Sequence, residues 1–392
     1  GHDYLLRQMI LSLDFYKYHE AARLLGMPKK HSCKNLGCSM SCSGNTKHLS
    51  RENMLLLCSH SVLSKDILQF ALSNITLDKS MVPFLIETGL KSPFNDVHEW
   101  LIFHCRDLVI ANEVYWYIRV HSPVQDTTDY FNNSYGVSPG TRESVIPMNR
   151  KDTMAEVKKN KYNMLFMRWK QTVSEEHKIR IAKAAKLITF LEKLYTKNRG
   201  DIAQLKKWEI VLAHDIEQTD LKFKEAVYKN SASTPILMTF MRKKKKTLHF
   251  FDDMENETEI IRVLYKPSDI TKDQTCMNMI SFMDDIFKVE IGDFQVVKYR
   301  ILPTSPVGGL IEIVEAETLY SIYKKNQSIL NHIIDNNPDR STKNIRDIFI
   351  KSAAAYTCFA YILGLSDRHP DNIKVTKCGK LFEIDYEFLL GM

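Results

Sequence analysis

The chain has 392 residues, of which 44% are hydrophobic and 26% are charged. This composition is typical of globular domains and excludes a largely disordered chain. Lys and Arg number 54 against 47 Asp and Glu, and the resulting net charge of +7 selects no partner by itself. The longest apolar runs fall short of the ~20 residues that cross a bilayer, so any membrane contact is expected to be peripheral.

The N-terminus lacks the charged region, apolar stretch and cleavage site of a secretory signal. The sequence therefore predicts an intracellular protein, soluble or peripherally associated with membranes. Four of the eight cysteines, namely Cys58, Cys105, Cys276 and Cys358, fit ordinary apolar segments as reduced thiols. The exception is a polar stretch that could offer zinc four soft ligands, namely His31, Cys33, Cys38 and Cys42. We consider a polar loop without zinc the better interpretation.

The first part of the chain has helical periodicity. Residues 3–120 predict packed helices interrupted by the Cys-rich loop, and residues 121–149, rich in Pro, Gly, Ser and Asn, predict a linker or surface loop. A second helical region is expected over 150–228. One of its faces is apolar, formed by Ile181, Ala184, Ile188, Leu191 and Tyr195.

The pattern changes near residue 229 to short runs that favour β-structure. Strands are expected in an antiparallel sheet at 231–241, 247–251, 259–266, 294–302 and 308–314, with a helix over 271–288. Residues 316–364 return to helical periodicity, and 372–385 predict a hairpin that turns at Cys378 and Gly379. The fold class is therefore expected to be α+β.

The most specific motif lies near the end of the chain. ILGLSDRHPDNIKV at 362–375 is followed by FEIDYEFLLG at 382–391, so a D-x-H-x-x-N loop precedes a hairpin end that bears an aspartate. Carboxylate and amide oxygens are suitable ligands for magnesium in phosphoryl transfer. A polar loop without catalytic role is the alternative, and the full ordered set argues against it.

These segments resemble the catalytic loop and metal-binding motif of the phosphatidylinositol 3- and 4-kinase superfamily, whose members read close to G-x-D-R-H-x-x-N and then F-H-I-D-F-G. The resemblance implies that His369 acts as base or charge stabiliser toward an inositol hydroxyl and that Asp367 orients the loop. It also implies that Asn372 and Asp385 hold Mg²⁺, with Mn²⁺ as a substitute.

Upstream segments resemble the ATP-binding parts of the same family. IIRVLYKPSDITKDQ resembles the strand with the phosphate-binding lysine, NSASTPILMTF the serine-bearing phosphate loop, and KYRILPTSPVGGLIEIV the adenine pocket. The implied ATP-binding residues are Ser231, Ser233, Lys266, Asp269, Asp273, Tyr299, Glu312, Val314 and Ile384. In this assignment Lys266 contacts the α-phosphate, and Glu312 with Val314 forms the hinge.

The resemblance implies a bilobal kinase domain with a small lobe at 229–315 and a large lobe from 316 that is incomplete or atypical at Met392. QSILNHIIDNN, VTKCGKLFEID, YRILPTS and DQTCMNMISFMDDIF look nearest to the class III enzymes of this family, which act on phosphatidylinositol, so the implied product is its 3-phosphate. The implied partners are a phosphoinositide at a membrane surface and a regulatory protein on the helical region, without nucleic acid. The alternatives are a phosphatidylinositol 4-kinase, a related protein kinase, and a catalytically weak nucleotide-binding scaffold.

Three positions depart from the family pattern. Glu387 stands where D-F-G has glycine, Lys374 stands where an apolar side chain packs under adenine, and Glu383 stands where histidine is usual. The basic run at 242–246 is either a solvated hairpin tip or a contact to anionic lipid, and we favour the solvated tip.

Overall fold

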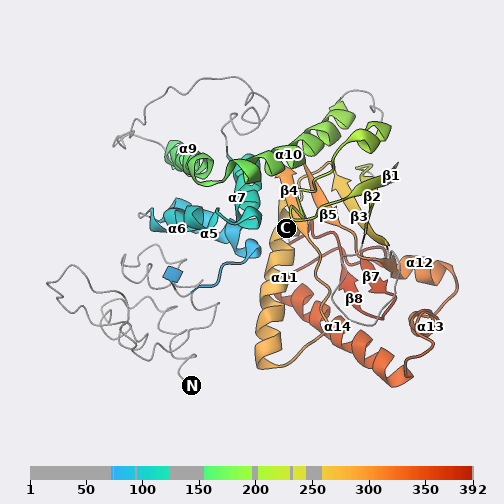
Figure 1. Cartoon of the computed structure of the whole chain (residues 1–392). Helices are drawn as coiled ribbons and strands as arrows, with labels where there is room; N and C mark the ends of the chain where they lie inside the picture. The colour runs from blue at the N-terminus through green and yellow to red at the C-terminus, as the bar shows by residue number, and fades with distance from the viewer. Residues whose placement is uncertain are drawn as a thin grey trace, which may run out of the picture. The chain divides into compact units, whose positions relative to one another are not determined.

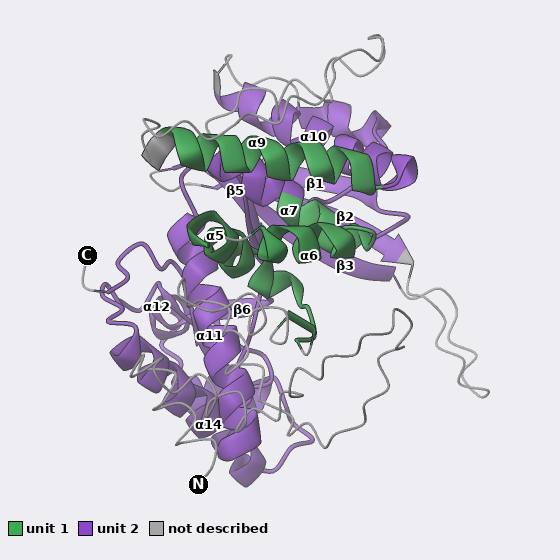
Figure 2. Cartoon of the chain, turned by 90° about the vertical axis from the view of Figure 1, so that its left-hand side faces the viewer, with its two compact units in different colours: residues 1–114, 142–173 green, residues 115–141, 174–392 purple. Residues whose placement is uncertain are grey.

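The computed structural model describes residues 72–73, 75–92, 95–122, 154–196, 202–229, 233–243 and 258–390. The predicted zinc ligands His31, Cys33, Cys38 and Cys42 lie outside these ranges, as do nearly all of the predicted linker and the expected strand at 247–251. The chain divides into two compact units, residues 1–114 with 142–173, and residues 115–141 with 174–392 (Figure 2).

Unit 1 is helical where it is described. After the 3₁₀ turn η2 (Lys79–Met81) come α5 (Val82–Lys91), α6 (Asp96–His104), the start of α7 (Leu108–His121) and α9 (Met154–Thr172). The indole of Trp169 on α9 is buried and donates to the carbonyl of Ala111 at 2.8 Å. The ammonium of Lys161 donates to three carbonyls at the end of α5, where the helix dipole favours a cation. These contacts join α5, α7 and α9.

A buried histidine fixes the packing of α6 on α5. His98 Nε2 donates to the carbonyl of Ile86 at 3.1 Å, and its ring lies against Gly89, where a Cβ atom would come within 2.2 Å of it. Glycine is therefore required by this close approach. Burial is the main cause that lowers the pKa of His98 below its ordinary value, because it disfavours the charged ring.

Unit 2 contains a five-stranded antiparallel sheet in the order β1-β2-β3-β5-β4. Its strands are β1 (Lys222–Tyr228), β2 (Ile236–Lys243), β3 (Thr258–Lys266), β4 (Ile301–Ser305) and β5 (Gly308–Glu312). The same unit contains α10 (Glu175–Thr196), the 3₁₀ helix η3 (Ile202–Lys207) and α11 (Thr271–Glu290) (Figure 1). The expected antiparallel sheet and the helix at 271–288 are confirmed.

Two predicted elements of this unit were wrong. Residues 222–228 form strand β1 and not helix. The sequence pattern was misleading because a register shift between Phe223 and Glu225 breaks the two-residue alternation that is typical of a strand. The shift places apolar residues three apart, which imitates a helical pattern. The strand expected at 294–302 begins only at Ile301, because Val297 and Tyr299 turn into the core without pairing to a neighbour.

A second, three-stranded sheet follows, in the order β6-β7-β8, with β6 (Ala316–Thr318), β7 (Ile373–Thr376) and β8 (Leu381–Glu383). Between β6 and β7 lie α12 (Leu319–Lys324), α13 (Ile329–Asp335) and α14 (Thr342–Ile362). Each of these helices begins at a hydroxyl N-cap, formed by Thr318, Ser328 and Ser341. The β7-β8 hairpin turns at Gly379, whose φ of 93° requires glycine.

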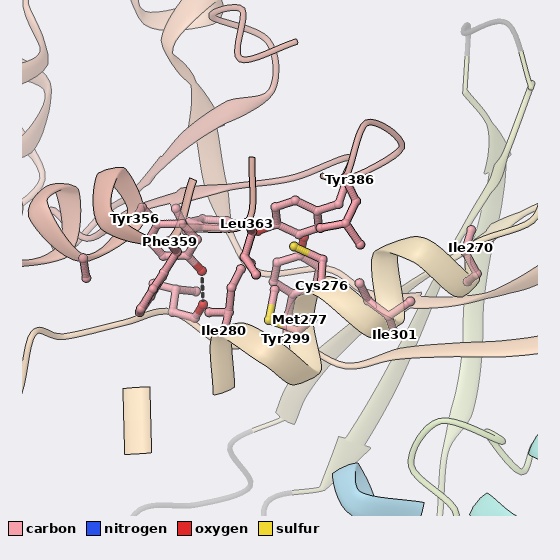
Figure 3. Packing of buried hydrophobic residues seen from close by; sticks show 14 residues of the cluster. Ile270, Cys276, Met277, Ile280, Tyr299, Ile301, Tyr356, Phe359, Leu363 and Tyr386 are labelled. Carbon is pink, nitrogen blue, oxygen red and sulfur yellow. Dashed lines mark hydrogen bonds between the residues drawn. The ribbon is translucent and has the colours of Figure 1, made fainter. Parts of the chain in front are cut away.

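The core of unit 2 joins α11, α14 and the end of the chain (Figure 3). Phe359 of α14 is fully buried and stacks on Phe287 of α11 with ring centroids 5.4 Å apart. The hydroxyl of Tyr356 donates to the carbonyl of Val297 at 2.5 Å. The segment before β4, which pairs with no strand, is thereby bonded to α14 and packs in the same core as α11. No helix in the described ranges is both long enough and apolar enough to cross a membrane.

Replacing Phe359 by Ala should lower the free energy of unfolding by about 3–5 kcal/mol, because it leaves a cavity between α11 and α14. Tyr361→Ala on the same helix is the matched control, since Tyr361 is 87% exposed and its loss should change stability by less than about 0.5 kcal/mol. Urea unfolding followed by circular dichroism measures both. Equal losses would contradict the assigned core.

His98 should make the stability of unit 1 depend on pH. Because its folded-state pKa is lowered, its contribution is present above the unfolded value of about 6.5 and is lost as the pH falls toward the folded value, by at most ~1.4 kcal/mol per pH unit. His98→Gln should remove this slope. Urea unfolding at pH 5 and pH 8, followed by tryptophan fluorescence, gives the slope for each protein, and identical slopes would refute the assignment.

Candidate active site

A cavity of about 210 Å³ lies in unit 2, between the five-stranded sheet and the β7-β8 hairpin. Its apolar lining comes from both sheets and from the segment after β5, and includes Leu264, Ile301, Ile311, Val314, Phe382 and Ile384. Its polar lining includes Ser233, Lys266, Asp273, Tyr299, Glu312, Lys374 and Asp385. A cavity lined by apolar side chains and by charged groups of both signs is suited to a ligand that has an apolar part and a charged part.

Most predicted ATP-binding residues line this one cavity. The exceptions are Ser231, which lies outside the described residues, and Asp269, which is not part of the lining. Asp269 instead accepts hydrogen bonds from the amide and hydroxyl of Thr271 at 2.8 and 2.7 Å. Its place in the structure is therefore at the start of α11.

Lys266 ends strand β3 and shares a cavity-facing side with Leu264, because alternate residues of a strand face the same way. Its ammonium lies 3.2 Å from Oδ1 of Asp385, and its side chain is only 19% exposed. The Asp385 side chain is 44% exposed, so it has room for a second partner. The structure thus brings together two predicted residues that are 119 positions apart.

Asp273, in the first turn of α11, is 4% exposed and accepts a hydrogen bond from the amide of Tyr386 at 2.8 Å. Burial raises the pKa of its carboxyl group, and the charge of Lys266 opposes that rise. The carboxylate therefore positions the residue that follows Asp385. Asp273 thus lines the cavity and also bonds to the backbone of the predicted metal-binding segment.

The D-x-H-x-x-N loop is closed by its own hydrogen bonds. Asn372 donates from its side chain to the carbonyl of Asp367 at 3.0 Å and from its backbone to that of His369 at 2.9 Å. Asp367 has a φ of 58°, a left-handed conformation that aspartate tolerates better than most residues. His369 is partly exposed, and its Nε2 lies 3.9 Å from Oδ2 of Asp367.

The loop and the metal-binding segment are bonded to each other. The amide of Ile384 donates to the carbonyl of Asn372 at 2.9 Å. Arg368 donates to the carbonyls of Ser366 at 2.8 Å and Ile384 at 3.0 Å, and also to the carbonyl of Asp385. In the sequence Arg368 is only one residue of the D-R-H motif, so its hydrogen bonds to these carbonyls were not predicted.

Glu383 stands where the family has histidine, and the structure accommodates it. Its side chain is buried, which raises the pKa of the carboxyl group, and the nearby Arg368 guanidinium at 3.6 Å opposes that rise. Its carbonyl accepts from the hydroxyls of Tyr299 at 3.2 Å and Tyr386 at 2.8 Å. The predicted pocket residue Tyr299 is therefore also a support for this strand.

The predicted hinge lies where β5 ends. The carboxylate of Glu312 accepts from the amide of Arg300 at 2.9 Å, and the amide of Ile313 donates to the carbonyl of Arg262 at 3.0 Å. The amide of Val314 makes no backbone hydrogen bond among the described residues. Val314 also lines the cavity.

The donor set near Asp385 suits a hard cation. The side-chain nitrogen of Asn372 is bonded to Asp367, which leaves its amide oxygen as the group for a metal, and Asp385 offers a partly exposed carboxylate. Within the described ranges there is no group of three or more His, Cys, Asp or Glu side chains that could hold a metal. A cation held by Asn372 and Asp385 would thus take its other ligands from water or phosphate.

Comparison with known proteins identifies the relatives of this segment. Residues 260–392 match the family model described as phosphatidylinositol 3- and 4-kinase. The nodule isoform of phosphatidylinositol 3-kinase from Glycine max is 36% identical over 134 residues, which are 33% of this chain and 16% of the relative. Phosphatidylinositol 3-kinase VPS34 from Saccharomyces cerevisiae is 34% identical over 171 residues, which are 42% of this chain and 18% of the relative.

The resemblance inferred from the motifs is therefore confirmed over residues 260–392, the part of the chain that the family model matches. This chain spans less than a fifth of the length of either relative. The mixed architecture of unit 2, with its antiparallel sheet and packed helices, confirms the expected α+β fold class.

Arg368→Lys should lower the free energy of unfolding by about 1–3 kcal/mol, because a compact ammonium cannot serve all the carbonyls that the planar guanidinium holds. Arg346→Lys, at an exposed position of α14, is the matched control and should change little. Urea unfolding of both variants tests this. A loss for Arg368→Lys no larger than for the control would exclude the clamp.

Proposed function

We propose that this protein transfers the γ-phosphate of ATP to a phosphoinositide headgroup, with Mg²⁺ as cofactor and the 3-hydroxyl of phosphatidylinositol as acceptor. The observation that carries the proposal is the direct bonding of the D-x-H-x-x-N loop to the segment of Asp385, beside a cavity into which Lys266 projects. The family match over 260–392 supports the same reaction class.

The residues supply the parts that phosphoryl transfer requires. The apolar wall and the amide of Val314 would bind the base, and Lys266 would neutralise phosphate charge. Asn372 and Asp385 would hold Mg²⁺, which neutralises charge on the transferred phosphoryl group. The Lys266–Asp385 ion pair keeps both charged groups in place before substrate arrives.

The surroundings of His369 favour one of its two expected roles. Its Nδ1 accepts a hydrogen bond from the amide of Asp371 at 3.2 Å, so a neutral ring carries its proton on Nε2. In this tautomer Nε2 donates and does not accept. We infer that His369 stabilises negative charge near the acceptor hydroxyl, and that a role as base would require it to give up the Asp371 contact.

The choice of the 3-position rests on the relatives. Those from Glycine max and Saccharomyces cerevisiae are named phosphatidylinositol 3-kinases, as is a VPS34 protein from Arabidopsis thaliana that is 34% identical over 134 residues. The named activity of these longer proteins supports the 3-hydroxyl as the acceptor in this chain. A peripheral position at the membrane follows from a lipid acceptor.

Transfer of labelled γ-phosphate from ATP to liposomes tests the proposal, with phosphatidylinositol, its 4-phosphate or its 4,5-bisphosphate as acceptor. Asp385→Ala should reduce transfer to phosphatidylinositol at least about 100-fold, because it removes a cation ligand and the partner of Lys266. Asp347→Ala, an exposed carboxylate on α14, is the matched control and should retain activity.

Headgroup analysis of the product separates the 3-kinase from the 4-kinase. Labelling of protein in place of lipid would favour a related protein kinase. ATP binding by the wild-type chain without transfer to any acceptor would favour a nucleotide-binding scaffold and would contradict the proposed reaction.

A further inference from the structure

Unit 2 has a second cavity, of about 450 Å³, on the opposite face of strand β3 from the candidate active site. Leu264 and Lys266 line the first cavity, whereas Tyr265 between them lines the second. This follows from strand geometry, because successive side chains of a strand point to opposite faces of the sheet. The rest of the second lining comes from α7, α10, the residue after β3 and the β4-β5 hairpin end. The proposed function assigns no role to this cavity.

Two buried polar groups at the second cavity have no hydrogen-bond partner among the described residues. They are Nη1 of Arg119, whose side chain is 5% exposed, and Oγ of Ser305, a residue that is 8% exposed. Arg119 belongs to the part of α7 that lies in unit 2, and Ser305 ends β4. Buried donors are nearly always bonded, because a donor without a partner costs free energy. These two groups therefore indicate that a ligand or ordered water occupies the cavity.

Other contacts hold the Arg119 guanidinium in place. Its Nη2 donates to both carboxylate oxygens of Glu192, at 3.4 and 3.2 Å. Its Cζ lies 5.1 Å from the centre of the Trp116 ring, and the guanidinium also interacts with the hydroxyl of Tyr115. A side chain that is already restrained loses little freedom when a further acceptor binds to it. Nη1 is therefore a fixed donor at the cavity wall.

Tyr265 connects the two polar groups in space. Its hydroxyl would lie 2.5 Å from a Cβ atom at Gly308, and Gly308 is the cross-strand partner of Ser305. The same hydroxyl is within electrostatic reach of Glu192 and Arg119. Ser305 and the Arg119–Glu192 pair are thus brought together around one tyrosine hydroxyl.

The charges in the lining cancel. Arg119 and Glu192 are the only charged residues among the described residues that line this cavity, and they form an ion pair at 3.2 Å. Glu192 would repel an anionic ligand, and Arg119 would repel a cationic one. A neutral ligand meets neither repulsion. The Glu192 carboxylate has acceptor positions beyond those that Arg119 uses, so it can also accept from an N–H group of a ligand.

The remaining walls are apolar and partly aromatic. The rings of Tyr195 and Tyr265 lie 5.9 Å apart between their centroids, and two prolines and a valine complete the lining. The valine, Val307 in the β4-β5 turn, is 67% exposed, which places it at the mouth of the cavity. These walls favour a ligand whose body is a flat ring.

We propose that this cavity binds a neutral molecule that carries a carboxamide or lactam group on a planar ring. The carbonyl oxygen accepts from Nη1 of Arg119, and the N–H group donates to Glu192 beside it. The Ser305 hydroxyl bonds to the same polar group, and the ring packs on Tyr195 and Tyr265. The volume is within the range of about 300–1,000 Å³ that is usual for small-molecule sites. This inference goes beyond the proposed function and does not depend on it.

The alternative is that only ordered water fills the cavity. A polar cavity of this size has room for several water molecules, and water would satisfy both Arg119 and Ser305. It would explain the two unpartnered groups, but it would give the cavity no preference among ligands of different charge.

The test is ligand-observed NMR of the whole chain with benzamide, benzoate and benzylammonium, three probes of nearly the same shape and different charge. Benzamide should bind with a Kd on the order of 1–10 mM, as expected for so small a molecule. Benzoate and benzylammonium should bind at least about fivefold more weakly, because Glu192 repels the first and Arg119 the second.

Ser305→Ala removes one polar group of the site and no hydrogen bond among the described residues, so the variant should fold normally. It should raise the Kd of benzamide about threefold to tenfold. Ser321→Ala on α12 is the matched control, because Ser321 is a partly buried serine that does not line the cavity. The control should leave the Kd unchanged, and thermal unfolding of both variants verifies the fold.

Glu192→Gln tests the neutral character of the site. Without the carboxylate, Arg119 keeps its charge and loses its ion-pair partner. Benzoate should then gain at least about fivefold in affinity relative to benzamide.

Three results would overturn the inference. Benzamide that does not bind to the wild-type chain would leave water as the occupant. An unchanged Kd in Ser305→Ala, or displacement of benzamide by ATP, would place the probe outside this cavity. Tighter binding of benzoate than of benzamide to the wild-type chain would contradict a neutral ligand. None of these results bears on the proposed phosphate transfer, which the liposome assay tests separately.

Discussion

The backbone of Ile384, Asp385 and Tyr386 is the part of unit 2 on which the candidate site depends. Asp385 has a φ of 62°, a conformation that is unfavourable for most residues and needs support from its surroundings. The supports come from the D-x-H-x-x-N loop and from α11: Ile384 bonds to Asn372, Arg368 donates to the carbonyls of Ile384 and Asp385, and Tyr386 bonds to Asp273. The backbone conformation therefore fixes the direction of the Asp385 carboxylate, which lies within ion-pair distance of Lys266.

This support places polar groups in the interior, and each is stabilised by a partner. Burial raises the pKa of both Asp273 and Glu383, so each would be a poorly solvated charge without Lys266 or Arg368 nearby. The tyrosine hydroxyls around them are also bonded, since Tyr299 and Tyr386 donate to the carbonyl of Glu383 and Tyr356 donates to that of Val297. Figure 3 shows that these aromatic rings come together from α14, from the segment before β4 and from the end of the chain. The apolar core and the polar supports of the site are thus one packed region.

The sequence motifs predicted which residues form the candidate site, but not the contacts that support them. The motif can be recognised because the loop and the hairpin that follows it are close together in the sequence. The spacing between its members, Asp367, His369, Asn372 and Asp385, is therefore visible in the sequence itself. The helix at 271–288 followed from a clear 3.6-residue period. Strand β1 was missed because its register shift imitates helical spacing, and the roles of Arg368 and Asp273 were missed because their backbone partners leave no mark in any side-chain pattern. The contact between Lys266 and Asp385, 119 residues apart, could be expected only through the family resemblance.

The same geometry bears on the departures from the family motif. A glycine after D-F would be valued for backbone freedom, yet within residues 385–387 the positive φ belongs to Asp385 and not to Glu387. Glu387 is exposed, and its carbonyl accepts from the ammonium of Lys272 at 3.3 Å, so the backbone here has an ordinary conformation and a partner. Glu383 is likewise matched by Arg368 within the same motif. Two substitutions that look disruptive in the sequence are therefore compatible with the backbone that aims Asp385. The third, Lys374, lies in the lining of the cavity, so its side chain bears on the candidate site and not on the backbone that aims Asp385.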